Sequence, residues 1–290
     1  MGVKANRNGP PAEPQPVLLE RLLPHGEPVG AEEIVAALRA EERPAVPSGR
    51  PYLTLNMVST VDGRASIGGR SGPLGGAADR ELFHALRRAA DAIMVGAGTA
   101  RSERYGRMIR DASRRRERHE RGLPAEPLSC IVSGRLSLPA DLPLLADPEA
   151  RVVILTASAA SIPGTRAEVD YVRAGRAGGV DLGAALAELR ERFAVGALLC
   201  EGGPHLNSQL LLAGLVDELL LSLSPQLAGG DSSPEEEPRI LAGVELEPPV
   251  QLALLGALRS GSELFLRYAV CVSAGEHVSR ETMLKSSPAS

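Results

Sequence analysis

The 290-residue chain is poor in aromatic residues, with three phenylalanines, four tyrosines and no tryptophan. Proteins that bind single-stranded nucleic acid stack bases on aromatic side chains, so this shortage argues against that class. The net charge of −4 argues against it as well, since a nucleic-acid surface is basic. The arginine-rich run over residues 114–121 is interrupted by Glu117 and Glu120, and we interpret it as a solvated loop or helix face.

Long apolar runs are also missing. No window approaches the roughly 18 uninterrupted apolar residues of a membrane span, and the N-terminus lacks the charged and apolar regions of a secretory signal. Cysteine is scarce, and Cys130, Cys200 and Cys271 are far apart, each within an apolar run. Without zinc-ligand spacing they predict reduced, buried strand residues and no metal site. We therefore expect a cytoplasmic protein that does not bind membranes.

The distribution of proline and polar residues divides the chain into three parts. Residues 1–50 are expected to form a Pro-rich, partly disordered extension with one helix over residues 31–42. Residues 51–273 are expected to form the globular domain. The polar residues 274–290 are expected to form a flexible tail.

Short β-rich runs alternate with helical periods through most of the domain, as in α/β proteins. The predicted strands lie at residues 52–58, 92–95, 128–132, 152–155, 169–172, 197–200, 218–223, 250–258 and 263–272. The predicted helices lie at residues 79–90, after a cap at Asp181, and from Pro204 onward. Ser260-Gly261 joins the last two strands without a helix. The pattern predicts a mixed, mainly parallel β-sheet flanked by helices that ends in an antiparallel C-terminal hairpin.

The most informative segment is Cys200-Glu201-Gly202-Gly203-Pro204, where an apolar strand opens directly into a helix. Such a junction presents free backbone N–H groups and the positive end of a helix dipole to an anion. No lysine follows the glycines, so a Walker-type loop that transfers phosphoryl groups is disfavoured. The segment alone fits an anion site and a plain tight turn equally well.

A second junction, Gly96-Ala97-Gly98-Thr99, also ends a predicted strand, which favours a nucleotide-binding crevice at the carboxyl edge of the sheet over two plain turns. It lacks the third glycine of the Rossmann fingerprint, so a standard Rossmann domain is disfavoured. The glycine-rich residues 66–76 fit either a lid over that crevice or a mobile surface loop.

Several motifs, in this order and spacing, resemble the riboflavin-pathway pyrimidine reductase family. They are Pro51-Tyr52-Leu53-Thr54-Leu55-Asn56 with Ser59-Thr60-Val61-Asp62-Gly63-Arg64, Asp79-Arg80 with Leu86-Arg87, residues 92–99, and Glu201-Gly202-Gly203-Pro204 through Ala213-Gly214-Leu215-Val216-Asp217-Glu218-Leu219. The resemblance covers residues 52–268. It implies a dihydrofolate-reductase-like fold, NADPH as hydride donor, a phosphorylated ribosylamino-pyrimidine as substrate and a homodimer. The deaminase motif of the fused bacterial members is missing, so a stand-alone reductase is expected.

The resemblance also implies the residues that contact the cofactor. They are Val58, Gly96, Gly98, Thr99, Glu103, Ser133, Gly134, Arg135, Gly202, Gly203, Pro204, His205 and Leu206. Ser133 and Arg135 suit the 2′-phosphate of NADPH, because a guanidinium forms charge-assisted bonds with phosphate. His205 is expected to contact the cofactor rather than to act as an acid.

Matching positions imply the substrate contacts Asn56, Ser71, Arg87, Arg107, Arg110 and Glu201. Arg87 and Arg110 suit a phosphate, and the Glu201 carboxylate suits exocyclic amines of a diaminopyrimidine. Asp62 is the candidate for orienting substrate or relaying a proton. The structural alternatives are an exposed helix arginine at position 87 and a loop-capping carboxylate at position 201.

The chain departs from the family in two places. Residues 104–110 replace a short segment that contains Asp-Pro, which leaves open which arginine meets the phosphate, and Asn56 stands where fused enzymes often have lysine. Two other functions therefore remain open: a dihydrofolate or pterin reductase on the same fold, and a non-catalytic NADPH-binding protein.

Overall fold

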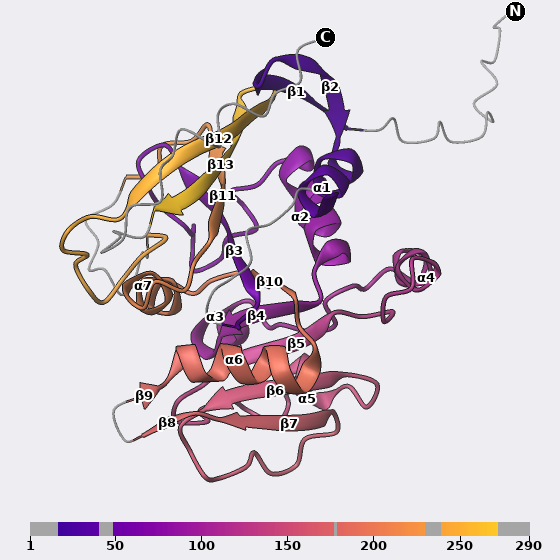
Figure 1. The fold of residues 1–290 in the computed structure, drawn as a ribbon, viewed down its shortest axis with the longest axis vertical. Helices are drawn as coiled ribbons and strands as arrows, with labels where there is room; N and C mark the ends of the chain where they lie inside the picture. Colours follow the sequence, from indigo (N-terminus) through magenta and orange to yellow (C-terminus); the bar gives the residue numbers. More distant parts are fainter. Residues whose placement is uncertain (1–16, 41–48, 177–178, 230–238, 272–290) are drawn as a thin grey trace, which may run out of the picture.

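The computed structural model describes residues 17–40, 49–176, 179–229 and 239–271, which build one large sheet with helices around it (Figure 1). The strands are β1 (Leu18–Leu23), β2 (Gly26–Gly30), β3 (Tyr52–Thr60), β4 (Ala92–Gly96), β5 (Leu128–Val132), β6 (Arg151–Thr156), β7 (Glu168–Arg173), β8 (Gly175–Arg176), β9 (Gly179–Val180), β10 (Ala197–Cys200), β11 (Glu218–Ser224), β12 (Gln251–Ser260) and β13 (Glu263–Cys271). The helices are α1 (Ala31–Ala40), α2 (Ala77–Ala89), α3 (Ala97–Ser102), α4 (Ala112–Glu120), α5 (Pro143–Ala146), α6 (Leu182–Phe193) and α7 (Pro204–Leu212).

The large sheet has the strand order β2-β1-β12-β13-β11-β3-β10-β4-β5-β6-β7. All neighbours from β11 to β7 are parallel, whereas those from β2 to β11 are antiparallel. The β12–β13 hairpin pairs Ser260 with Glu263 around its turn. The predicted fold class is therefore confirmed.

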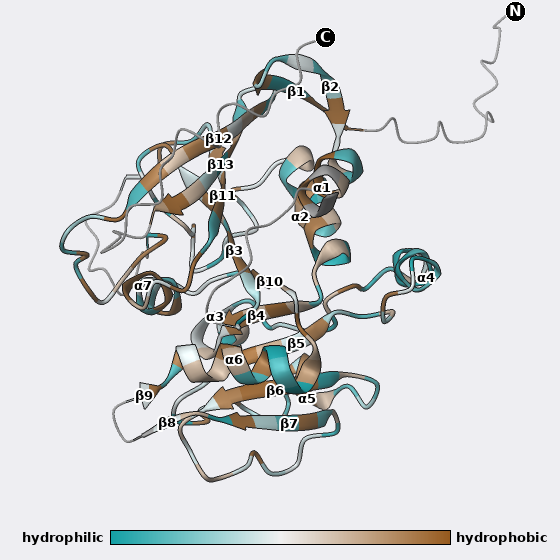
Figure 2. Cartoon of the chain, viewed as in Figure 1, coloured by the Kyte–Doolittle hydropathy of each residue, from teal (hydrophilic) through white to brown (hydrophobic). Residues whose placement is uncertain are grey.

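Alternate residues of the central strands enter two separate cores, because successive side chains of a strand point to opposite faces. Ile93 and Val95 of β4 pack with Leu86 of α2 in one core. Met94 packs with Leu186 of α6 in the other. Strands covered on both faces are expected to be continuously apolar, and Figure 2 shows β4, β5 and β6 as hydrophobic.

The helix predicted after Asp181 illustrates why local signals succeed here. The Asp181 carboxylate accepts a hydrogen bond from the N–H of Ala184 and caps α6. Leu182 and Leu189 of this helix are buried in the core. The other predicted strands and helices of the domain are also present, with ends shifted by a few residues.

Several elements were not predicted. Strands β1 and β2 lie in the N-terminal segment, where only α1 was expected, and β1 pairs antiparallel with β12 (Figure 1). Helices α3 and α5 and the small β8–β9 pair were also missed. The arginine-rich run forms α4, which is hydrophilic in Figure 2. Its Arg118 is buried and donates to the carbonyl oxygens of Arg88 and Pro124.

Some predictions fall outside the described residues. These are residues 1–16 and 41–48 of the expected N-terminal extension, and the tail expected over residues 274–290. Cys130 and Cys200 are buried as predicted, but Cys271 is only half-buried. Within the described ranges, no helix is both long and apolar enough to cross a membrane.

Candidate active site

The two glycine junctions lie side by side at the carboxyl ends of β4 and β10. These strands are parallel neighbours, with Cys200 paired to Met94. Just beyond them, the N–H of Gly96 donates to the carbonyl oxygen of Gly202 across 2.8 Å. The structure therefore joins the junctions into one surface at the sheet edge, where α/β folds bind ligands.

A cavity of about 1370 Å³ opens over this surface. Small-molecule sites commonly measure about 300–1000 Å³, so this one has room for a dinucleotide together with a second small molecule. The predicted residues that line it are Ser71, Gly96, Gly98, Thr99, Glu103, Ser133, Gly134, Arg135, Glu201, Gly202, Gly203, Pro204, His205 and Leu206. Segments far apart in the sequence thus meet at one site.

The N-terminus of α7 forms part of the cavity wall. Pro204 occupies its first turn, and Gly203 is an N-cap without a side-chain hydrogen bond. The N–H of Asn207 donates to the carbonyl oxygen of Gly203 across 2.9 Å, so the N–H groups of His205 and Leu206 precede the first helical hydrogen bond. Free N–H groups and the helix dipole together favour an anion at this wall.

Ser133 follows β5 and is one of the clearest signs of a ligand. The residue is only 4% exposed, and its Oγ is buried without a hydrogen-bond partner in the described part of the chain. Buried hydroxyls are normally paired, because an unpaired one loses the hydrogen bonds it makes in water. Arg135 lies two residues further on, exposed on the same cavity. The pair suits an anionic group that accepts hydrogen bonds.

The Glu201 side chain lines the cavity and is held there by several hydrogen bonds. Arg87 of α2 grips its carboxylate with two bonds, Nε to Oε1 and Nη2 to Oε2, both 2.6 Å long. The Tyr105 hydroxyl donates to Oε2 across 2.7 Å. Arg87 also donates through Nη1 to the carbonyl oxygen of Met108. Arg87 and Tyr105 therefore orient the carboxylate together. Arg87 itself is not among the residues that line the cavity.

The Glu201 carboxylate influences the protonation states of its two partners, Arg87 and Tyr105. Burial acts to lower the pKa of Arg87, but the adjacent Glu201 carboxylate outweighs it and raises that pKa above its ordinary value. Burial, together with the negative charge of Glu201, raises the pKa of Tyr105 well above its ordinary value. Arg87 thus stays charged and Tyr105 stays protonated, so both remain hydrogen-bond donors to Glu201.

Ser71 and Glu103 connect the glycine-rich loop to the segment after α3. The backbone N–H and the hydroxyl of Ser71 both donate to Glu103 Oε1, across 2.8 and 3.0 Å. A predicted substrate residue and a predicted cofactor residue are thus bonded to each other. Part of the loop, at Ser66, Gly69 and Ser71, forms a wall of the cavity.

Comparison with known proteins identifies the family. The model of the RibD C-terminal domain matches residues 51–266. The chain belongs to the RibD C-terminal domain family. The resemblance stated from the sequence motifs is therefore confirmed.

Named relatives of this RibD C-terminal domain include archaeal enzymes. It is 29% identical over 228 residues to the 2,5-diamino-6-ribosylamino-4(3H)-pyrimidinone 5′-phosphate reductase of Methanothermobacter thermautotrophicus, covering 76% of this chain and 99% of that protein. It is 33% identical over 191 residues to the protein of the same name from Archaeoglobus fulgidus, covering 64% and 85%. A solved pyrimidine reductase-like protein of Corynebacterium diphtheriae superposes with a TM-score of 0.63 at 26% identity, covering 84% of this chain and all of that one.

Asp62 lies outside the cavity of this RibD C-terminal domain. Its carboxylate accepts hydrogen bonds from the Thr60 hydroxyl and from the N–H groups of Ala228 and Gly229. The bond from Thr60 and, after it, the one from Gly229 lower the pKa of Asp62 to about 2. An acid so strong is ionised at neutral pH and fixes a loop, so this geometry does not support the proton relay expected from the sequence.

The other predicted arginines also lie outside the cavity lining. Arg107 is engaged by Asp147 Oδ2 at 3.1 Å and by Glu149 Oε2 at 2.6 Å. Arg110 is exposed and forms no ion pair with any described residue. Of the predicted substrate residues, only Ser71 and Glu201 line the cavity directly, and Arg87 acts on it through Glu201.

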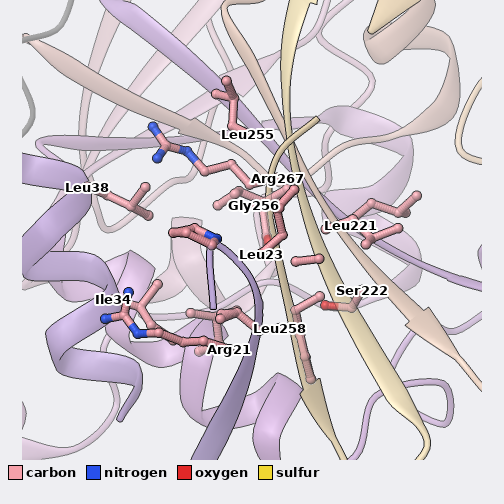
Figure 3. A pocket seen from close by; sticks show the side chains of 17 residues that line it. Arg21, Leu23, Ile34, Leu38, Leu221, Ser222, Leu255, Gly256, Leu258 and Arg267 are labelled. Carbon is pink, nitrogen blue, oxygen red and sulfur yellow. The ribbon is translucent and has the colours of Figure 1, made fainter. Parts of the chain in front are cut away.

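Asn56 and Val58 of β3 are likewise not part of this cavity. Asn56 lines a second, mostly apolar cavity of about 200 Å³. Figure 3 shows its wall from α1, with Ile34 and Leu38, opposite strand residues such as Leu258. The structure therefore separates Asn56 from the predicted substrate contacts in the large cavity.

The large cavity is also lined by residues that were not predicted as site residues, among them Tyr105, Met57 and Arg101. Tyr105 stands in the segment that departs from the family, so no motif indicated its role. Its partner Glu201 is 96 positions away, and no local pattern encodes such a contact.

Proposed function

We propose that this chain is an NADPH-dependent reductase of riboflavin biosynthesis that converts the ribosyl side chain of a 5-amino-6-(5-phosphoribosylamino)uracil-type pyrimidine to ribityl. The observation that carries the proposal is the single cavity in which two glycine junctions, the unpaired Ser133 hydroxyl and the buried Glu201 carboxylate meet. Membership of the family supports it, as do the names of the relatives from Methanothermobacter thermautotrophicus and Archaeoglobus fulgidus.

The residues present fit NADPH. The glycine junctions leave space for a diphosphate beside the N-terminus of α7, with the N–H groups of His205 and Leu206 as donors. The unpaired Ser133 hydroxyl and Arg135 would hold the 2′-phosphate. When bound, the cofactor supplies a hydride to the substrate carbon.

The protein itself contributes positioning. Glu201, held by Arg87 and Tyr105, accepts a hydrogen bond from an N–H of the pyrimidine and fixes the ring in the cavity. Ser71, held by Glu103, places the glycine-rich loop against the bound substrate. Alignment of two reactants in this way supplies several kcal/mol of the barrier reduction, on the order of 7 kcal/mol in well-aligned systems.

We propose that the substrate phosphate extends beyond the cavity lining to Arg110, because Arg110 is the predicted substrate-binding arginine whose guanidinium forms no ion pair with described residues. We also propose a homodimer and a cytoplasmic location. Sedimentation velocity of the full chain tests the dimer.

Turnover tests the function directly. Purified protein is incubated with NADPH and, in separate reactions, with the uracil-type pyrimidine, its 2-amino counterpart and dihydrofolate, while NADPH absorbance is followed. Substrate-dependent loss with either pyrimidine is expected. Turnover of dihydrofolate alone would establish the folate alternative, and saturable NADPH binding without any turnover would establish the non-catalytic alternative.

A further inference from the structure

Tyr105 is rigidly placed at the edge of the cavity. Its N–H donates to the carbonyl oxygen of Ala100 across 2.9 Å, and its carbonyl oxygen accepts from the N–H of Leu144 across 3.0 Å. Its ring packs against the core beside Arg87, whose Cζ lies 5.6 Å from the ring centroid. The hydroxyl therefore reaches Glu201 from an anchored backbone.

The hydrogen bonds on Glu201 leave the carboxylate little freedom. Two carboxylate oxygens offer about four acceptor positions in total. Oε2 accepts from Arg87 Nη2 and from Tyr105, so its positions are filled. Oε1 accepts only from Arg87 Nε among the described residues, which leaves one position open.

The residue that carries the open position lines the large cavity. Glu201 and Tyr105 both line the large cavity, whereas Arg87 does not. The side chain of Glu201 is only 3% exposed, so water does not surround its carboxylate freely. A group in the cavity that carries an N–H can complete the set of hydrogen bonds.

We propose that Tyr105 is a positioning residue that turns Glu201 into a single-site acceptor, with Oε1 left to read one N–H of the pyrimidine. This inference rests on the proposed function, because it takes the pyrimidine as the ligand. Tyr105 does not touch the reacting atoms and acts through Glu201. A ring edge that presents an N–H is bound, whereas an edge that presents only a carbonyl oxygen meets a negative charge and is repelled.

The test is a double-mutant cycle on the full chain with Tyr105→Phe, Glu201→Gln and both together, assayed by steady-state NADPH consumption. Tyr105→Phe removes only the hydroxyl and is expected to raise KM for the pyrimidine by about tenfold, with kcat and the KM for NADPH within about twofold of wild type. In the Glu201→Gln background the same change is expected to add less than about twofold.

Tyr171→Phe is the matched control. Its hydroxyl also makes one hydrogen bond, accepting from the N–H of Ile162 across 2.8 Å, but it lies away from the cavity lining. It is expected to leave KM for the pyrimidine unchanged. Thermal unfolding of every variant checks the fold, and Tyr105→Met, which fills similar volume without a hydroxyl, repeats the test if Tyr105→Phe does not fold.

The outcomes separate the two proposals. If wild type consumes no NADPH with either pyrimidine, the proposed function fails, and the assignment of Tyr105 fails with it. If wild type turns over the pyrimidine but Tyr105→Phe keeps the wild-type KM, only the assignment of Tyr105 is overturned. It is also overturned if the effects of Tyr105→Phe and Glu201→Gln simply add, since Tyr105 then does not act through Glu201.

Discussion

Gly203 and Thr99 face each other across the two glycine junctions, and a Cβ atom on Gly203 would lie 2.5 Å from Thr99 Oγ1. Real Cβ contacts are never that short in a relaxed structure, so a larger residue at position 203 forces either the Thr99 side chain to rotate or the two junctions to separate. The close approach explains why this wall of the cavity needs glycine.

Gly203→Ala is therefore expected to weaken NADPH binding about 10- to 100-fold, because a displacement of roughly 1 Å in a binding wall has effects of that size. Fluorescence titration with NADPH measures it. Gly30→Ala is the control, since a Cβ on Gly30 meets nothing within 4 Å. Equal NADPH affinity of wild type and Gly203→Ala would contradict the role of this wall.

The buried pair of Arg87 and Glu201 makes a prediction about stability. Arg87→Met leaves the Glu201 carboxylate buried without its charged partner and is expected to lower the free energy of unfolding by about 3–5 kcal/mol. Adding Glu201→Gln removes the unpaired charge and is expected to recover much of that loss. Urea unfolding of the single and double variants measures both effects.

The control for that prediction is another arginine–glutamate pair. Arg192 and Glu188 form an i,i+4 ion pair on the solvated side of α6. Arg192→Met is expected to cost at most about 0.5 kcal/mol, because exposed helix pairs contribute little. Equal losses for Arg87→Met and Arg192→Met would show that burial of the first pair has no energetic consequence.

Substitution of Ser133 distinguishes a side chain that contacts a ligand from one that stabilises the fold. Its hydroxyl has no partner among described residues, so Ser133→Ala is expected to change the free energy of unfolding by less than about 0.5 kcal/mol while weakening NADPH binding about tenfold. Ser208, whose hydroxyl bonds to Pro204 and Ala242, provides the contrast. Ser208→Ala is expected to lose about 1 kcal/mol of stability. Retained NADPH affinity in Ser133→Ala would show that the hydroxyl does not meet the cofactor.

Asp62 predicts a pH dependence of stability. Its pKa is lowered from an ordinary 3.8 to about 2, chiefly by the hydrogen bond from Thr60, so it stabilises the folded state above about pH 4. This contribution is lost as the pH falls through about 2. Asp62→Asn is therefore expected to have a lower Tm than wild type near neutral pH, and the difference should close toward pH 2. Thermal melts across that range measure it, and a constant difference would contradict the assignment.

The sequence predicted the elements whose signals are local. Asp181 is an N-cap residue that predicts the start of α6, and the continuous apolar run at residues 92–95 predicts a strand buried on both faces. Strands β1 and β2 have no comparable local signal in the sequence. Apolar and polar residues do not alternate regularly along β1, and most residues of both strands are exposed or half-buried. Their place in the sheet depends on β12, far away in the sequence.

The cavity was predicted more completely than the side chains that act on it. Small residues that line the cavity, such as Gly96 and Gly203, belong to motifs that can be read directly from the sequence. Long charged side chains have a choice of partners, and the sequence does not state which one is taken. Arg87 donates hydrogen bonds to Glu201, 114 positions away. Asp62 accepts a hydrogen bond from the backbone N–H of Gly229, 167 positions away.

The pairing of β1 with β12 has a consequence for how the chain is completed during synthesis. Glu20 and Arg259 lie opposite each other in this pair although 239 positions separate them. Strand β1 must therefore wait for β12, which is synthesised much later, before the two can pair, and loop closure over such a distance is entropically slow. Until then β1 has an unpaired edge, which makes the nascent chain vulnerable to aggregation.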